Sequence, residues 1–454
     1  MYKAIKLLSF SVLITCIAAF SCRNKTTALA IQEGLTHHPL QSEQDLDVII
    51  NNIGNARVVL LGEASHGTAE YYTWRAAITR RLINEKGFNF IAIEGEWADS
   101  YRVNNFIKGG PQDSIAAVNL LKQYNRWPTW MWANYEVASL VTWLNRHNQA
   151  KAANEKVGFF GLDVYCLWES MEELKPYLQN LPDSIKQLAN QVHQCFQPFN
   201  SDAQEYAVAV ARSESICRAQ VEKLWSAIYQ YTGSKTATTE DQFVMQQNAL
   251  VALNAEKYYR MMVSSGAGSW NVRDGHMSQT LQRLLDLHGP NSKVIVWEHN
   301  THVGDARYTD MVDEGMINVG QIARETFGRE NVFIVGFGSY TGSVIAAEAW
   351  DAPYKRMHVP AAMPGSWEHM LHRIGKGDKI LLSNEIRNNK SLQGRIGHRA
   401  IGVVYHPNRE AGNYVPSIIP ERYDAFIYFE RSNALRPIPV TPKNEPPDTY
   451  PSGY

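Results

Sequence analysis

The sequence has few cysteines, no surplus of charge and none of the common nucleotide-binding or zinc-binding motifs. Its 44 Lys+Arg nearly balance 45 Asp+Glu and form no basic cluster, which argues against nucleic acid as a partner. The H-E-x-x-H, P-loop and G-x-G-x-x-G patterns are all missing, which argues against a zinc protease or a nucleotide-binding protein. The segment Glu63-Ala64-Ser65-His66-Gly67 lacks the first glycine of a G-x-S-x-G motif, so Ser65 is a poor candidate for a nucleophile.

Residues 1–22 have the pattern of an export signal. Lys3 and Lys6 precede an apolar run of 14 residues, Leu7 to Phe20, whereas a membrane-spanning helix needs about 20. The run leads into Cys22 through a small residue, which resembles the lipobox of bacterial lipoproteins, although Ala19 replaces the usual Leu or Val. We therefore expect a lipoprotein signal peptide with Cys22 as the lipidation site, and an exported, membrane-anchored protein facing the periplasm. Secretion without lipid and an uncleaved anchor are the alternatives.

Three cysteines follow this segment: Cys166, Cys195 and Cys217. Their spacing matches no zinc motif. In an oxidising compartment Cys195 can pair with Cys217 if the two helical segments that carry them lie antiparallel. Two unpaired thiols on helix faces are the alternative.

Six short apolar runs alternate with longer amphipathic segments and predict an α/β fold. Each run has the length of a strand and is rich in branched or aromatic side chains. Segments of helix length, such as 70–86 and 137–148, lie between them. This alternation predicts a mostly parallel central sheet flanked by helices. The predicted strands are 57–61, 88–93, 157–162, 293–297, 331–335 and 425–429.

Two regions depart from the alternation. Residues 167–263 carry long amphipathic patterns without a strand, which predicts a helical insertion covering the active-site rim. From Pro437 the chain has six prolines in 18 residues, which predicts an irregular tail. We expect one α/β hydrolytic domain over residues 23–437, followed by a Pro-rich tail at 438–454.

Ionisable side chains follow four of the predicted strands. Ligands of open parallel sheets bind outside the carboxyl ends of the strands, where the loops converge. These side chains should therefore meet at one edge of the sheet, and an aromatic content of 11% suits a pocket for a bulky, partly apolar ligand. The residues concerned are Glu63, His66, Glu94, Glu96, Asp163, Glu298, His299, Asn300, His302 and Asp305.

A histidine beside a carboxylate is the arrangement of general-base catalysis. The carboxylate fixes the imidazole tautomer and stabilises the imidazolium that forms. Glu63 and His66 lie three apart in one loop, and His299 and His302 are spaced likewise. Arg75, on the helix after the first loop, is the nearest candidate for an electrophile that polarises a carbonyl.

The same residues permit two other interpretations. One is a non-catalytic lipoprotein that binds haem or another apolar ligand through a histidine. The other is a metal-dependent hydrolase, because imidazole and carboxylate ligands suit zinc or manganese. Its ligands would be His66, His299 or His302 together with Glu63, Glu94 or Glu298.

At these residues the sequence resembles the erythromycin esterase family. The G-E-x-x-H-G and H-N-x-H-x-G-D pieces are the specific ones, and the likeness covers most of residues 45–438. Glu298 is a departure, because relatives commonly have a small residue before the late His-Asn pair. The matching stretches are LLGEASHGTAEYYTWR, FIAIEGEWADSYRVNNFI, RWPTWMWANYEVASLVTWLNRHN, GFFGLDVYCLWES, RDGHMSQTLQRLL, VIVWEHNTHVGDAR and YDAFIYFERSNALRPI.

The resemblance implies hydrolysis of a macrocyclic lactone without a metal, a cofactor or a covalent acyl-enzyme. It implies that His66 activates water, that Glu63 orients His66, and that Glu94 holds the framework. Arg75 with His299 or His302 would polarise the carbonyl. We further expect Glu96, Asp163 and Asn300 to contact the substrate. The resulting hypothesis is an exported, lipid-anchored macrolide esterase that hydrolyses erythromycin and confers resistance.

Overall fold

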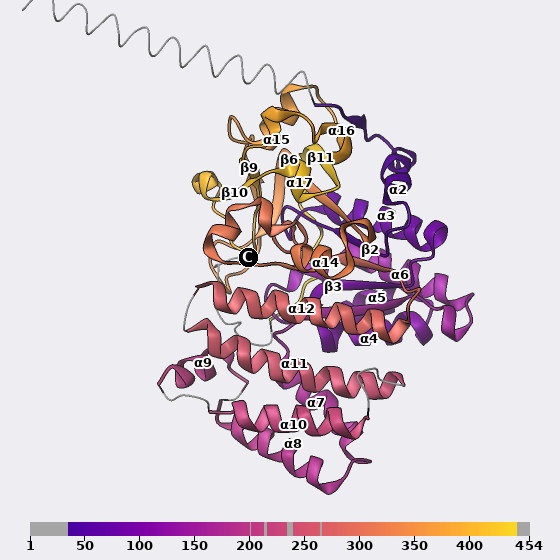
Figure 1. Cartoon of the computed structure of the whole chain (residues 1–454), viewed down its shortest axis with the longest axis vertical. Coiled ribbons are helices and arrows are strands. Elements are labelled where there is room, and N and C mark those ends of the chain that lie inside the picture. Colours follow the sequence, from indigo (N-terminus) through magenta and orange to yellow (C-terminus); the bar gives the residue numbers. More distant parts are fainter. Residues whose placement is uncertain (1–34, 200, 213–215, 234–238, 264–265, 443–454) are drawn as a thin grey trace, which may run out of the picture.

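The computed structural model describes residues 35–199, 201–212, 216–233, 239–263 and 266–442 (Figure 1). The predicted signal peptide and Cys22 lie outside these ranges. Within them, no helix is both long enough and apolar enough to cross a membrane.

All six predicted strands form, and they lie side by side as one parallel block. Their order across the sheet is β11-β6-β2-β5-β3-β4. The expected α/β architecture, with a mostly parallel sheet flanked by helices, is therefore confirmed. The strands are β2 (Val58–Leu61), β3 (Phe90–Glu96), β4 (Gly158–Asp163), β5 (Val294–Trp297), β6 (Val332–Ala346) and β11 (Ala425–Ser432).

Antiparallel strands that the sequence analysis did not predict extend this block. β8 pairs with β11, β1 pairs with β8, and β7 pairs with the distal half of β6. A separate two-stranded ribbon is formed by β9 and β10. These strands are β1 (His38–Pro39), β7 (Lys355–Val359), β8 (Lys379–Leu382), β9 (Ile396–Arg399) and β10 (Tyr414–Ser417).

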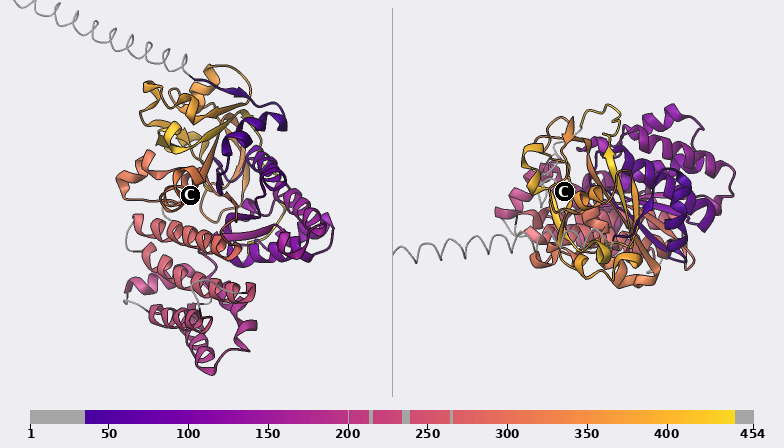
Figure 2. Two further views of the ribbon diagram at one scale, coloured as in Figure 1. Left: turned by 45° about the vertical axis from the view of Figure 1, so that its right-hand side comes forward. Right: turned by 90° about the horizontal axis from the view of Figure 1, so that it is seen from above.

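Helices cover both faces of the sheet. In β2, Val59 and Leu61 belong to one hydrophobic core and Val58 and Leu60 to the other, which explains why this strand reads as an uninterrupted apolar run. Figure 2 shows the N-terminal helices, in indigo and purple, gathered on one side of the molecule. The first core contains α2 (Asp47–Ile53), α3 (Ala69–Lys86), α5 (Ser114–Leu121) and α6 (Tyr135–Gln149); the second contains α12 (Gly266–His288), α14 (Val319–Phe327) and α15 (Trp367–Arg373); α4 (Trp97–Gly109) contributes to both.

The predicted helical insertion forms between β4 and α12 and has a hydrophobic core of its own. Its long helix α11 packs on α7, α10 and α12, so the insertion is continuous with the layer that covers the sheet (Figure 1). It reaches the site through Tyr259, whose hydroxyl donates a hydrogen bond to the carbonyl of Tyr165 just after β4. The helices are α7 (Leu167–Leu178), α8 (Asp183–Phe196), α9 (Ala203–Arg212), α10 (Arg218–Tyr231) and α11 (Glu240–Met262).

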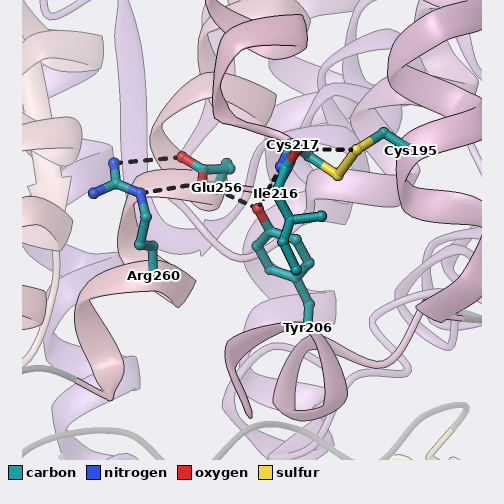
Figure 3. The surroundings of a disulfide bond; sticks show 6 residues. All are labelled: Cys195, Tyr206, Ile216, Cys217, Glu256 and Arg260. Carbon is teal, nitrogen blue, oxygen red and sulfur yellow. Dashed lines mark hydrogen bonds and ion pairs between the residues drawn. A yellow bond between two sulfur atoms is a disulfide. The ribbon is translucent and has the colours of Figure 1, made fainter. Parts of the chain in front are cut away.

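A disulfide joins Cys195 of α8 to Cys217 at the start of α10 (Figure 3). Of the two arrangements that the sequence left open, the paired one is present. The amide of Cys217 donates to the hydroxyl of Tyr206, which in turn donates to Glu256 of α11. Cys166 is a buried free thiol.

The chain remains attached to the core slightly beyond the point where a tail was expected. Ile438 is buried, and its amide donates to the carbonyl of Ala133. Val440 still packs against the core, and residues 443–454 lie outside the described residues.

Candidate active site

The loop after β2 carries Glu63 and His66 and is fastened to distant parts of the chain. The carbonyls of Glu63 and Ala64 accept hydrogen bonds of 2.8 Å from the amides of residues 300 and 401, and that of Gly67 accepts 3.0 Å bonds from residues 345 and 435. A Cβ at Gly67 would lie 1.9 Å from the carbonyl oxygen of Ile345, so only glycine fits there. The loop geometry is therefore set by tertiary contacts.

His66 and Glu63 form a buried hydrogen-bonded pair, as the sequence predicts. Nδ1 of His66 lies 2.8 Å from Oε1 of Glu63, and both side chains are about 2% exposed or less. A carboxylate only accepts hydrogen bonds, so the proton of the neutral ring sits on Nδ1 and Nε2 keeps its lone pair. Because His66 lines a cavity at this edge of the sheet, this lone pair suits it to accept a proton from water.

Arg75 lies behind this pair. Its Nη2 is 2.5 Å from Oε2 of Glu63, and its guanidinium lies between the rings of Tyr72 and Trp297, at 4.5 and 4.6 Å from their centroids. Arg75 is fully buried and is absent from the cavity wall. The expectation that it polarises a substrate carbonyl does not fit this position. Instead, Arg75 holds the carboxylate that orients His66.

A second charged cluster joins the ends of β3 and β4 to α12. Arg273 donates to Glu94 at 2.7 Å and makes a bidentate contact with Asp163 at 2.7 and 3.0 Å. Burial alone would raise the pKa of Glu94. The neighbouring positive groups, including Arg273, outweigh burial and lower the pKa of Glu94 below the usual value for a glutamate. All three residues line the cavity, so Arg273 brings a fixed positive charge to the wall that also carries His66.

Sequence reasoning missed Arg273, although a signal was available. Trp270, Met277 and Leu281 form one apolar stripe of α12, and Arg273 falls within that stripe. A charged residue on the buried stripe of an amphipathic helix needs a buried partner. The partners of Arg273 follow strands that are distant in the sequence, so the sequence alone could not identify them.

His302 is enclosed in the core and does not line the cavity. Its Nδ1 lies 3.0 Å from both oxygens of Asp274 and its Nε2 accepts a hydrogen bond from Arg273 at 3.1 Å. These partners place the proton on Nδ1 and occupy the Nε2 lone pair. His302 also stacks on Trp270. It therefore supports Arg273 and has no lone pair left for a substrate or a metal ion.

His299 lies directly behind His66, with ring centroids 4.9 Å apart. Its amide donates to Glu94 at 2.8 Å, and its Nδ1 is 2.8 Å from the hydroxyl of Thr301. Burial lowers the pKa of His299 well below its usual value, and a charge on His66 lowers it further. His299 is thus a neutral support for His66 and does not line the cavity.

Asn300 is also a structural residue. Its side-chain amide donates to the carbonyl of Phe337 at 2.7 Å and lies 3.2 Å from Nε2 of His398. His398 in turn pairs with the buried Glu368 at 2.6 Å. These contacts connect the loop after β5 to β6 and β9, and they contradict the expectation that Asn300 contacts the substrate.

Asp305 too serves the fold. Its carboxylate accepts hydrogen bonds from Arg307 at 2.7 and 2.9 Å and from Arg324 at 3.1 Å.

Glu298 is buried next to Arg273's partners and makes no hydrogen bond through either carboxylate oxygen. Burial raises its pKa well above the usual value, and the charges of Glu94 and Asp274 raise it further. Both effects favour the neutral, protonated form of Glu298. Across the described ranges of residues 35–442, no three His, Cys, Asp or Glu side chains are grouped to hold a metal ion.

The cavity encloses about 730 Å³ of empty space, part of which is open to solvent. Glu96 and Asp163 line it, as expected for substrate contacts. The second guanidinium, Arg126, was not foreseen from the sequence, whereas the heavily aromatic wall agrees with the pocket that the aromatic content suggested. The aromatic residues are Tyr124, Trp127, Trp132, Tyr165 and Trp350.

The model of the family described as erythromycin esterase matches residues 83–432. The chain belongs to this family. Because this is a family of hydrolases, the chain is identified as a hydrolase. The matched range begins after Glu63, His66 and Arg75, so the assignment of these three residues to the site rests on the contacts described above.

The chain is similar to two proteins that are named as hydrolases. Erythromycin esterase type II of Escherichia coli is 25% identical over 348 residues, covering 68% of this chain and 75% of that protein. The putative hydrolase YbfO of Bacillus subtilis is 20% identical over 471 residues, covering 95% of this chain and 98% of that protein.

Solved structures show the same fold. A Bacillus cereus protein superposes with a TM-score of 0.76 at 17% identity, covering 91% of this chain and 99% of that one. A mutant of the erythromycin esterase EreC, in an open conformation, gives 0.65 at 17% identity, covering 89% and 100%. A succinoglycan biosynthesis protein gives 0.72 at 18% identity, covering 91% and 98%.

Proposed function

We propose that this hydrolase opens the lactone ester of macrolides such as erythromycin, with water activated by His66. The observation that carries the proposal is the buried hydrogen bond between Glu63 and His66, together with the position of His66 on the cavity wall. The resemblance to the Escherichia coli protein named erythromycin esterase type II supports the choice of substrate.

His66 carries the proton transfers of the reaction. Its Nε2 takes a proton from water as the water oxygen bonds to the carbonyl carbon, and the carbonyl electron pair moves onto oxygen. When this intermediate collapses, the lactone C–O bond breaks and the departing alkoxide takes the proton back from Nε2. Glu63 accepts the Nδ1–H bond throughout and stabilises the imidazolium between the two transfers. The products are a carboxylic acid and an alcohol on one opened chain.

Arg273 stabilises the charge that develops on the carbonyl oxygen. Its Nη1 carries two hydrogens, of which one is directed to His302. The other is available to the oxyanion, while Glu94 and Asp163 fix the guanidinium plane. Because these carboxylates hold the arginine before substrate binds, little reorganisation is needed during the reaction.

Mass spectrometry of erythromycin after incubation with the protein lacking residues 1–22 tests the proposal directly. Hydrolysis adds the mass of one water and generates a new carboxylic acid. Erythromycin that is recovered unchanged, from a preparation that hydrolyses a simple ester, would show that the site is an esterase for another substrate.

A further inference from the structure

The cavity holds more negative charge than its own cations balance. Four carboxylates line it, from Glu94, Glu96, Asp99 and Asp163, against the two guanidinium groups of Arg126 and Arg273. Arg273 is committed to Glu94 and Asp163. The imbalance therefore falls on Glu96, which lies beside Asp163 on the neighbouring strand, because Asp99 has a partner of its own in Arg102 at 2.8 Å.

Glu96 is the least satisfied of these carboxylates. Its Oε1 lies 2.9 Å from Nε of Arg126, but Arg126 is shared with Glu169, whose Oε1 lies 3.1 Å from Nη2. The Oε2 atom of Glu96 makes no hydrogen bond, although the side chain is nine-tenths buried. A buried carboxylate oxygen without a partner is unfavourable unless a ligand supplies one.

Burial and the neighbouring charges raise the pKa values of both Glu96 and Asp99. Burial, together with the charges of Asp163, Glu169 and Asp99, raises the pKa of Glu96 to about 8, despite the opposing effect of Arg126. Burial is also the main reason that the pKa of Asp99 rises to about 6. Both shifts describe a site that lacks one positive charge, since an added cation would favour the ionised carboxylates.

The walls around these carboxylates favour an organic cation. Five aromatic side chains line the cavity, and the rings of Trp127 and Trp350 lie 4.6 Å apart at 57°. Aromatic faces attract substituted ammonium groups and cover their alkyl surface. A metal ion requires several oxygen or nitrogen ligands, and no described part of the chain groups three suitable side chains.

We propose that Glu96 and Asp99, with the aromatic wall beside them, bind a substituted ammonium group of the substrate. We refer to Glu96, Asp99, Tyr124, Trp127, Trp132, Tyr165 and Trp350 as the ammonium subsite. This inference rests on the proposed function, because it places a basic amino sugar of a macrolide at one end of the cavity and the ester near His66. The subsite then selects esters that carry a cation over neutral esters of similar shape.

Tetraethylammonium is a suitable probe because its charge does not depend on pH. Calorimetry should show binding about tenfold tighter at pH 9 than at pH 7, which is the ratio of ionised Glu96 for a pKa of about 8. Near pH 8, binding should release a proton, visible as a dependence of the heat on the buffer. The charged or titratable groups that face Glu96 are Arg126, Asp99, Asp163, Glu169, Tyr124, Tyr259 and Cys166.

Glu96→Gln should abolish the pH dependence and the proton release and weaken binding about tenfold. Asp99→Asn, a second variant in case the first does not fold, should weaken binding with a smaller effect on the proton release. Glu172→Gln is the matched control, because Glu172 is exposed and pairs with Lys175 on the surface of α7. No binding at millimolar tetraethylammonium, or equal binding by the wild type and Glu96→Gln, would overturn the proposal.

A pair of esters separates this proposal from the proposed function. One carries a dimethylamino group and the other carries isopropyl at the same position, so they differ in charge but little in shape. The wild type should show a KM about tenfold lower for the amine, and Glu96→Gln should lose this preference, measured as the ratio of the two KM values. His66→Ala should still bind tetraethylammonium. An active enzyme without the preference refutes the subsite alone, whereas binding without hydrolysis in the wild type refutes the esterase alone.

Discussion

Nη2 of Arg273 lies 2.7 Å from Oε1 of Glu94, across 179 residues of sequence. This contact ties α12 to the carboxyl end of β3 and fixes a positive charge on the cavity wall. Both partners are buried, so removing either one leaves an uncompensated charge in the core. The pair therefore supports the fold and, in the proposed mechanism, also the reaction.

Arg273→Lys should lower kcat for ester hydrolysis by about 10²–10³, because a lysine keeps the charge but cannot maintain the planar contacts that direct an N–H to the oxyanion. The measurement is steady-state kinetics together with thermal melting. Arg283→Lys, on the same helix and in contact with Gln246 and Gln247, is the control. Unchanged kcat in a well-folded Arg273→Lys protein would assign charge stabilisation to another group.

His66→Ala should lower kcat by at least about 10²–10⁴, the usual contribution of a general base, without a comparable change in KM. Its melting temperature should stay near that of the wild type, since the lost side chain borders the cavity. His193→Ala, on the exposed side of α8, should behave as the wild type. Activity within threefold of the parent would remove His66 from the proton transfers.

Glu298→Gln should raise the melting temperature more at pH 8 than at pH 4.5. The folded-state pKa of Glu298 is raised, so its contribution to stability is complete below the unfolded pKa and is lost as pH rises towards the folded pKa. Glutamine keeps the shape and removes this loss. Thermal melting across the pH range measures the difference, and an equal effect at both pH values would show that Glu298 titrates normally.

Hydrolysis should survive prolonged treatment with EDTA or phenanthroline. The reason is geometric: both nitrogens of His302 are engaged, by Asp274 and Arg273, and Glu63 is shared by His66 and Arg75. Complete inactivation that is reversed by one equivalent of a divalent ion would favour the metal-dependent alternative and make the histidines ligands.

Cys22→Ser should move the protein from the membrane fraction to a soluble or unprocessed form when it is expressed in a bacterial host. This follows from the proposal that Cys22 receives lipid after removal of residues 1–21. Fractionation with immunoblotting measures it. Unchanged membrane partition, with residues 1–21 still attached, would indicate an uncleaved anchor.

The parallel block of the sheet was predictable because each of its strands is buried on both faces. VVLL of β2 and VIVW of β5 are therefore continuous apolar runs. The 15-residue length of β6 was not predictable, since Ser339, Tyr340 and Thr341 interrupt its apolar pattern. That part of the strand is stabilised by pairing with β7 and β11, which is information that only the tertiary structure holds.

In the site, local spacing and distant packing contributed differently. Glu63 and His66 meet because they are three apart in one loop, and the sequence alone gives that proximity. Asn300 and His302 also follow a strand, but they begin the short helix α13 (Asn300–Val303), which turns them towards Phe337 and Asp274 instead of the cavity. Proximity to a strand end predicts the neighbourhood of a residue, and only its partners decide whether it faces the ligand.

The four amides that fasten the loop of Glu63 and His66 belong to residues 300, 345, 401 and 435. A ribosome therefore finishes nearly the whole chain before the last of these contacts can form. A protein stopped before residue 435 would keep every residue of the proposed proton relay and still lack part of the frame that aligns it. We therefore expect the loop to acquire its full set of contacts only after the segment that contains residue 435 has been made and has packed.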